Sequence, residues 1–173
     1  MENMFRDLKA NEIDCRVSQI NEKGLALLLY KDARVDMDIL DETVGAKNWQ
    51  RKHTRDNANC IIEIWDEDKK QWISKEDTGT ESFTEKEKGL ASDSFKRAGF
   101  NWGIGRELYT APFIYVPIMD AKNEANFALE DKNGKKTTRT KFYVEAIEIT
   151  NKEITGLAIK NNKGKRVFVY KKG

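Results

Sequence analysis

Basic side chains gather between residues 88 and 106, and their chemistry is that of anion binding rather than of catalysis. Lys88, Lys96, Arg97 and Arg106 are cations that can contact phosphates spaced along a single nucleic-acid strand. Asp93 lies four residues before Arg97, so the same cations could instead form ion pairs on a solvated helix face. The segment therefore indicates either a nucleic-acid contact or an ordinary charged helix surface.

A helix from about Thr84 to Trp102 is predicted to carry these cations. One stripe at helical spacing holds apolar and small residues: Leu90, Ala91, Ser94, Phe95, Ala98 and Trp102. The side away from it holds Lys88, Ser92, Lys96 and Gly99. We therefore expect one face to pack and the other to expose cations. Gly103 and Gly105 follow where the helix should end, and we expect them to form a structural turn with positive φ or to expose amides to a phosphate.

Several kinds of catalytic site are excluded by residue type and spacing. The third glycine of a dinucleotide-binding loop would fall at Leu108, and the chain has no Walker-type phosphate loop. His53 is the single histidine, and Cys15 and Cys60 stand in no metal-binding or redox motif. We therefore predict no catalytic residue, no metal, no cofactor and no enzymatic activity.

The acidic cluster of Asp36, Asp38, Asp41 and Glu42 provides an alternative. Nucleases hold metal ions with such carboxylates, so a metal-dependent DNA-processing enzyme is a second interpretation. The spacing of the four is mixed, and we expect a solvated helix face instead.

The stretch from Glu87 to Tyr109 resembles the signature helix and turn of the Rad fifty-two superfamily of single-strand annealing proteins, above all its phage Sak-type members. The matching residues are Asp93, Lys96, Arg97, Gly103, Gly105, Arg106, Leu108 and Tyr109. A second segment, Tyr30 to Trp49, resembles the family at Arg34, Gly45 and Trp49. The resemblance covers roughly residues 25 to 116.

The resemblance implies an α+β fold in which an antiparallel meander packs against a long helix. It further implies a phage-encoded protein that binds single-stranded DNA and anneals complementary strands without ATP, in homologous recombination and DNA repair. The partners would be the DNA, further copies in a ring or filament, and a single-strand binding protein. The residues that would bind DNA are Arg34, Lys88, Lys96, Arg97 and Arg106.

Charge and length predict how the chain is divided. Residues 131–173 hold 12 Lys and Arg against 4 Asp and Glu, a net +8, whereas the preceding 130 residues carry −6. We expect an annealing domain over 1–119, then a basic linker and a three-stranded extension over 120–173. A third interpretation follows, in which this basic tail makes the chain a nucleic-acid or host-protein interaction module. The apolar runs are too short to span a membrane, and the start lacks a signal peptide, so we expect a cytoplasmic protein.

The remaining elements follow from apolar periodicity and turn residues. We predict helices over Met4–Lys9 and Val35–Val44, loops over Lys75–Ser82 and Asp120–Thr140, and seven strands. The strands cover Leu25–Tyr30, Asn48–Thr54, Ala58–Trp65, Gln71–Ser74, Lys141–Thr150, Ile154–Lys160 and Arg166–Lys171, with a short extended segment at Phe113–Val116.

Overall fold

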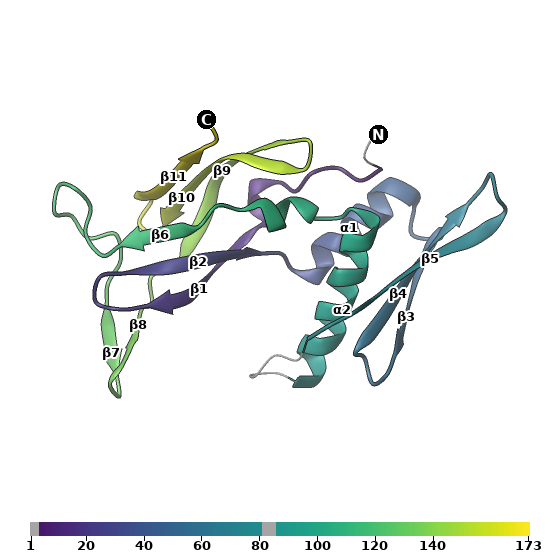
Figure 1. The fold of residues 1–173 in the computed structure, drawn as a ribbon, viewed down its shortest axis with the longest axis horizontal. Helices are drawn as coiled ribbons and strands as arrows, with labels where there is room; N and C mark the ends of the chain where they lie inside the picture. The colour runs from purple at the N-terminus through teal and green to yellow at the C-terminus, as the bar shows by residue number, and fades with distance from the viewer. Residues whose placement is uncertain (1–3, 81–85) are drawn as a thin grey trace. The chain divides into compact units, whose positions relative to one another are not determined.

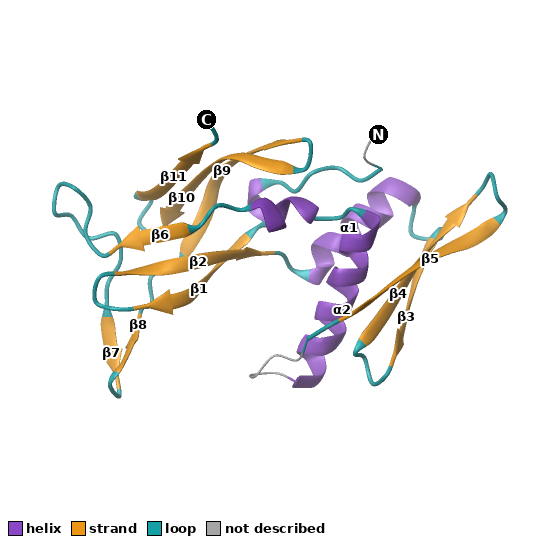
Figure 2. Ribbon diagram, in the orientation of Figure 1, coloured by secondary structure: helices purple, strands orange, loops and turns teal. Residues whose placement is uncertain are grey.

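The computed structural model describes residues 4–80 and 86–173, with side chains in the second range described from residue 89 (Figure 1). The fold is α+β, with two α-helices and antiparallel strand pairing throughout these ranges (Figure 2). The chain forms two compact units. One combines the N-terminal residues up to Asp7 with Asp32–Arg106, and the other combines Leu8–Lys31 with Glu107–Gly173.

The first unit packs helix α2 (Lys86–Trp102) against a three-stranded sheet. The sheet has the order β3 (Trp49–Thr54), β4 (Asn59–Asp66), β5 (Gln71–Thr78). Alternate residues of β4 are buried, namely Cys60, Ile62 and Ile64, because one face of the strand is covered by α2. Trp102 at the end of α2 donates its indole N–H to the Ile62 carbonyl at 3.1 Å.

Helix α1 (Ala33–Val44) covers a further side of α2. Its N-cap Asp32 accepts the Arg34 amide, and Gly45 ends it with a φ of 86°. Gly99 of α2 is buried at the crossing, where a Cβ would lie 2.7 Å from the Asp36 carboxylate. The expectation that Gly99 lies on an exposed face is wrong, because α2 packs on two sides.

The second unit is built on a six-stranded sheet. Its order is β11 (Arg166–Lys171), β10 (Glu153–Asn161), β9 (Phe142–Thr150), β1 (Asp14–Ile20), β2 (Gly24–Tyr30), β6 (Ile114–Pro117). The two outermost strands, β6 and β11, contact each other, so the sheet curls toward closure. A two-stranded hairpin, β7 (Glu130–Lys132) and β8 (Lys135–Thr137), and the 3-10 turns η1 (Ala10–Glu12) and η2 (Arg106–Thr110) complete the described elements.

This sheet encloses an apolar core drawn from strands far apart in the sequence. Leu25, Leu27, Val116, Val144 and Ile159 are each less than a tenth exposed. Strands on both sides of the predicted boundary at residue 119 therefore share one core, because β9–β11 continue the sheet of β1, β2 and β6. The basic C-terminal strands belong to the same compact unit as the first hairpin.

Most of the predicted elements are confirmed, and three local predictions are wrong. The helix at Val35–Val44, the strand at Leu25–Tyr30 and the C-terminal three-stranded meander are present. Met4–Lys9 is not helical, because the Leu8 amide donates to the carboxylate of Glu107, far along the chain, instead of closing a helical turn. Strand β5 extends four residues beyond the predicted Ser74, and hairpin β7–β8 lies within the predicted Asp120–Thr140 loop.

Candidate nucleic-acid interface

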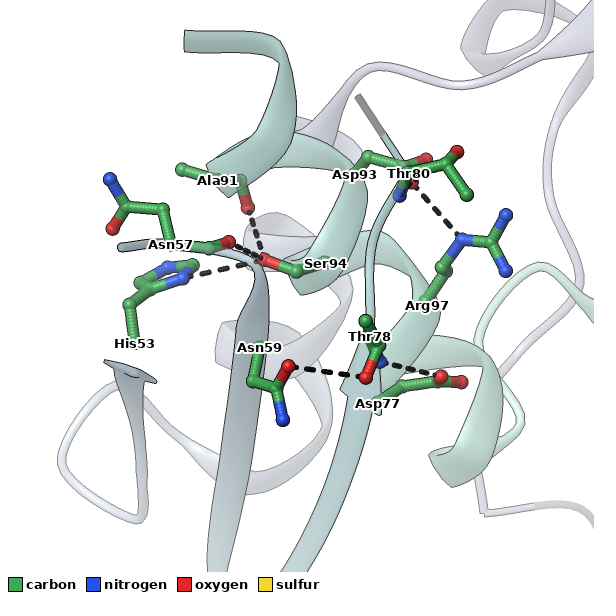
Figure 3. Close-up of polar contacts among 10 residues, drawn as sticks. All are labelled: His53, Asn57, Asn59, Asp77, Thr78, Thr80, Ala91, Asp93, Ser94 and Arg97. Atoms are coloured by element: carbon green, nitrogen blue, oxygen red, sulfur yellow. Dashed lines mark hydrogen bonds and ion pairs between the residues drawn. The ribbon is translucent and has the colours of Figure 1, made fainter. Parts of the chain in front are cut away.

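The middle of α2 presents Lys96 and Arg97, both only partly buried. Arg97 donates from Nε to Asp93 Oδ2 at 3.1 Å, one helical turn earlier (Figure 3). This is the ion pair within the helix that the sequence predicted as the alternative to a nucleic-acid contact. The same oxygen accepts the Thr80 amide at 2.7 Å, so Asp93 also fastens the segment that follows β5. In Figure 3 the two terminal nitrogens of Arg97 point away from Asp93, where they can meet an incoming anion.

The buried Ser94 brings α2 close to the β-sheet. The Ser94 hydroxyl lies 2.9 Å from the Asn57 carbonyl oxygen and 3.4 Å from His53 Nδ1 (Figure 3). A Cβ on Gly79 would lie 2.7 Å from the Ser94 backbone nitrogen. These contacts fix the rotation of α2. Burial and the neighbouring charge of Arg51 lower the pKa of His53, so its neutral form is favoured there.

Arg34 and Lys96, which are 62 residues apart in the chain, both act on the carboxylate of Asp32. The side chain of Arg34 is 81% exposed and is steered by Asp32, which accepts from Nε at 3.0 Å and from Nη2 at 3.3 Å. The hydrogen bonds from Arg34 lower the pKa of Asp32, and the charge of Lys96 adds to this effect. Asp32 therefore contacts Arg34 of α1 directly and feels the charge of Lys96 of α2 at longer range.

Arg106 has a different local role, at the C-terminus of α2. It donates from Nε to the Phe100 carbonyl at 2.6 Å and from Nη2 to the Asn101 carbonyl at 2.8 Å. Lys75 donates to the same Asn101 carbonyl at 3.1 Å. These cations satisfy carbonyls that the last turn of a helix leaves open, at the negative end of its dipole. Arg106 is exposed, but its guanidinium is already engaged by the backbone.

The glycine turn is a helix stop rather than a phosphate cradle. Gly103, with a φ of 98°, donates to the Phe100 carbonyl, and the Ile104 amide donates to the Gly99 carbonyl, which is the Schellman arrangement. Gly105 also has a positive φ, of 72°. Since the amides of Gly103 and Ile104 are engaged within the turn, they do not point to a ligand.

The side chain of Lys88 lies outside the described residues, so the structure does not place this predicted contact. Three of the four carboxylates of the alternative metal cluster have separate roles. Asp36 is buried against Gly99, Asp41 accepts the Trp49 indole N–H at 2.6 Å, and Glu42 accepts from Arg6 at 2.8 Å. Over residues 4–80 and 89–173, no three His, Cys, Asp or Glu side chains converge on a point where a metal ion could bind.

Sequence reasoning missed Asp32, which organises the cations of the two helices. The signal was present, because an Asp directly before an apolar helical period is a typical N-cap. It also missed Glu107, whose carboxylate is fully buried in the second unit. Charged residues are rarely buried, and the residues next to Glu107 in the sequence do not indicate that its side chain is buried.

Comparisons with protein-family models, with curated protein sequences and with solved structures find no match. Neither α-helix, over the part of the chain that is described, combines the length and the apolar character needed to cross a lipid bilayer.

Proposed function

We propose that this chain binds single-stranded DNA and anneals complementary strands without ATP, acting as a homo-oligomer in recombination and repair. The observation that carries the proposal is the partial exposure of the neighbouring Lys96 and Arg97 on α2, together with the exposed Arg34 at the start of α1, whose partner Asp32 feels the charge of Lys96. The resemblance of the helix and turn to phage annealing proteins supports it, and implies a phage-encoded protein that works in the cytoplasm of a bacterial host.

Cations on two helices give a short phosphate-binding surface on each subunit. A few exposed cations bind a strand weakly, and their contribution falls with salt because counterions are released from the DNA on binding. Repetition of the surface around a ring or along a curved filament raises the affinity by avidity, without a strong site on any one subunit. Strands held by their phosphates keep their bases available, and base pairing then supplies the free energy of annealing.

The binding test removes two cations of the surface together. We expect the double variant Lys96→Ala/Arg97→Ala to bind a labelled oligothymidylate more weakly than wild type. The slope of log affinity against log salt should fall by up to about 1.4, since each phosphate contact on a single strand contributes about 0.7. Fluorescence anisotropy over several salt concentrations measures both quantities. Unchanged affinity and slope in a folded, multimeric variant would rule out this surface.

The matched control removes two other cations of the same unit. Lys52 and Lys69 are exposed and paired with Glu63 and Asp66, at 3.0 and 3.7 Å. Lys52 lies on the face of the sheet that is turned away from α2, because it alternates with Arg51, which stacks on Phe95 of the helix. The variant Lys52→Ala/Lys69→Ala should keep the wild-type salt slope.

The activity test combines annealing with strand integrity. Complementary labelled oligonucleotides without ATP should anneal faster with the protein, and a mass measurement should show a multimer with and without DNA. Incubation with magnesium or manganese checks the nuclease alternative, since an annealing protein leaves strand length unchanged. The alternative of an interaction module that binds through its basic C-terminal strands is tested by substituting basic residues after Asp120. Deleting this segment would instead remove half of the six-stranded sheet.

A further inference from the structure

Two exposed tyrosines lie in one row on the outer face of the six-stranded sheet. Tyr30 of β2 and Tyr143 of β9 both pair with Asp14 of β1, so the three side chains project on the same side. The tyrosines are 42% and 49% exposed. Since neighbouring strands lie about 4.8 Å apart, their Cα atoms are about 10 Å apart. Planar rings that are partly exposed at this spacing are suited to stacking on bases.

The sheet opens beside this row. The pairing of β1 with β9 consists of the single pair Asp14–Tyr143, and on one side of it the two strands diverge. A hollow of about 450 Å³ lies there, lined by Cys15 to Val17, by Thr140 to Phe142 and by the two tyrosines. A second hollow of about 250 Å³ adjoins it at Thr140 and is lined in part by Phe127 and Lys163. The row therefore borders a recessed surface rather than a flat one.

The cations around the first hollow suit the phosphate backbone of a nucleic-acid strand whose bases stack on the tyrosines. Arg16 and Lys141 line it, and neither side chain has an ion-pair partner among the described residues. By contrast, Arg166 and Arg139 of this unit pair with Glu145 at 2.7 Å and with Glu130 at 3.0 Å. Two unpaired cations beside exposed rings match a phosphate next to a base. Asp14, between the rings, can accept the amino group of a base edge but repels phosphate.

We propose that this surface is a second single-strand contact, in which Tyr30 and Tyr143 stack on bases while Arg16 and Lys141 contact the flanking phosphates. The inference rests on the proposed function and deepens it. The cations on the helices of the first unit contact phosphates, and the tyrosine row of the second unit is a separate contact that stacks on bases. Stacking on tyrosine accepts any base, as annealing of arbitrary sequences requires.

The test compares aromatic and cationic variants on the same oligothymidylate. Tyr30→Ala/Tyr143→Ala should bind at least about tenfold more weakly with an unchanged salt slope, because stacking releases no counterions. Arg16→Ala/Lys141→Ala should lower the slope. Tyr143→Phe, which keeps the ring, should bind within twofold of wild type, and so should the control Phe113→Ala, since Phe113 is 77% exposed outside both hollows.

The outcomes separate this inference from the proposed function. If wild-type protein does not bind the oligonucleotide, both are overturned. If Lys96→Ala/Arg97→Ala weakens binding while Tyr30→Ala/Tyr143→Ala stays within twofold of wild type, the tyrosine surface alone is overturned. Circular dichroism establishes that each variant is folded. If the double tyrosine variant does not fold, Tyr143→Ala alone tests the same claim, with an expected loss of about fivefold.

Discussion

Glu107 should be the most sensitive carboxylate in the second unit, although it lies within the stretch that resembles a DNA-binding motif. It is fully buried; its Oε1 accepts the Leu8 amide at 2.7 Å and its Oε2 lies 3.8 Å from Lys152 Nζ. The side chain of Lys152 is itself only 12% exposed. Glu107 therefore joins the N-terminal segment to the β9–β10 turn inside this unit.

The substitution Glu107→Ala removes both contacts and leaves Lys152 without this carboxylate. A hydrogen bond to a charged group contributes about 1.5–3 kcal/mol, and breaking a buried ion pair from one side costs about 3–5 kcal/mol. The two energies describe the same carboxylate and therefore cannot be added. Because Oε2 has no hydrogen-bond partner, the lower end of the range for the ion pair applies. We expect the free energy of unfolding to fall by about 3 kcal/mol, and by about half of that for Glu107→Gln, which keeps an acceptor for Leu8.

Urea unfolding followed by far-ultraviolet circular dichroism measures this loss, and hydrogen exchange of the Leu8 amide localises it. The control is Glu153→Ala in the adjacent strand, whose carboxylate is 45% exposed in its pair with Lys172 and whose removal should leave the midpoint almost unchanged. A loss below about 1 kcal/mol for Glu107→Ala, with Leu8 still protected, would refute the assignment of this carboxylate to a structural role.

Three further predictions concern other groups. Gly99→Ala should destabilise the protein by about 1–2 kcal/mol in urea, despite better helix propensity, because its Cβ would meet the buried carboxylate of Asp36 at 2.7 Å; a stabilised variant would contradict this packing. Burial raises the pKa of the Cys15 thiol to about 12 and that of Cys60 to about 11, so both should react with Ellman's reagent at pH 8 roughly a hundredfold slower in the native protein than in urea. Since the pKa of His53 is lowered in the folded state, unfolded chains bind the proton first, and the free energy of unfolding should fall as pH drops below 6.5; His53→Gln should remove this part of the dependence.

Local signals in the sequence were enough to predict most helices and strands. The apolar period of α1 lies between an Asp N-cap and Gly45, and the hairpin turn Asn151-Lys152 adopts the positive φ values that a two-residue turn requires. The stop of α2 at Gly103 follows from the same kind of chemistry. These features depend on residues within a few positions of one another, so the chain specifies them before it packs.

The candidate site was predicted in its residues but not in its arrangement. Lys96, Arg97 and Asp93 share one helix, and the spacing of Asp93 and Arg97 alone predicts the ion pair that the structure contains. The approach of Arg34 to Lys96 depends on how α1 crosses α2, which the sequence does not state. Arg106 was predicted as a DNA contact from its place in the motif, but only the fold shows that it binds the carbonyls at the end of α2.

The sequence by itself determined the α+β composition, most of the helices and strands and the concentration of basic residues toward the C-terminus. Tertiary structure alone decided that β1 joins β9, that Glu107 is buried and that Tyr30 and Tyr143 share one face. The physical reason is how far apart in the chain the interacting residues lie. Caps, turns and periodicity arise from neighbouring residues, whereas strand partners and buried charges depend on the packing of segments far apart in the chain, whose pairing leaves no local pattern.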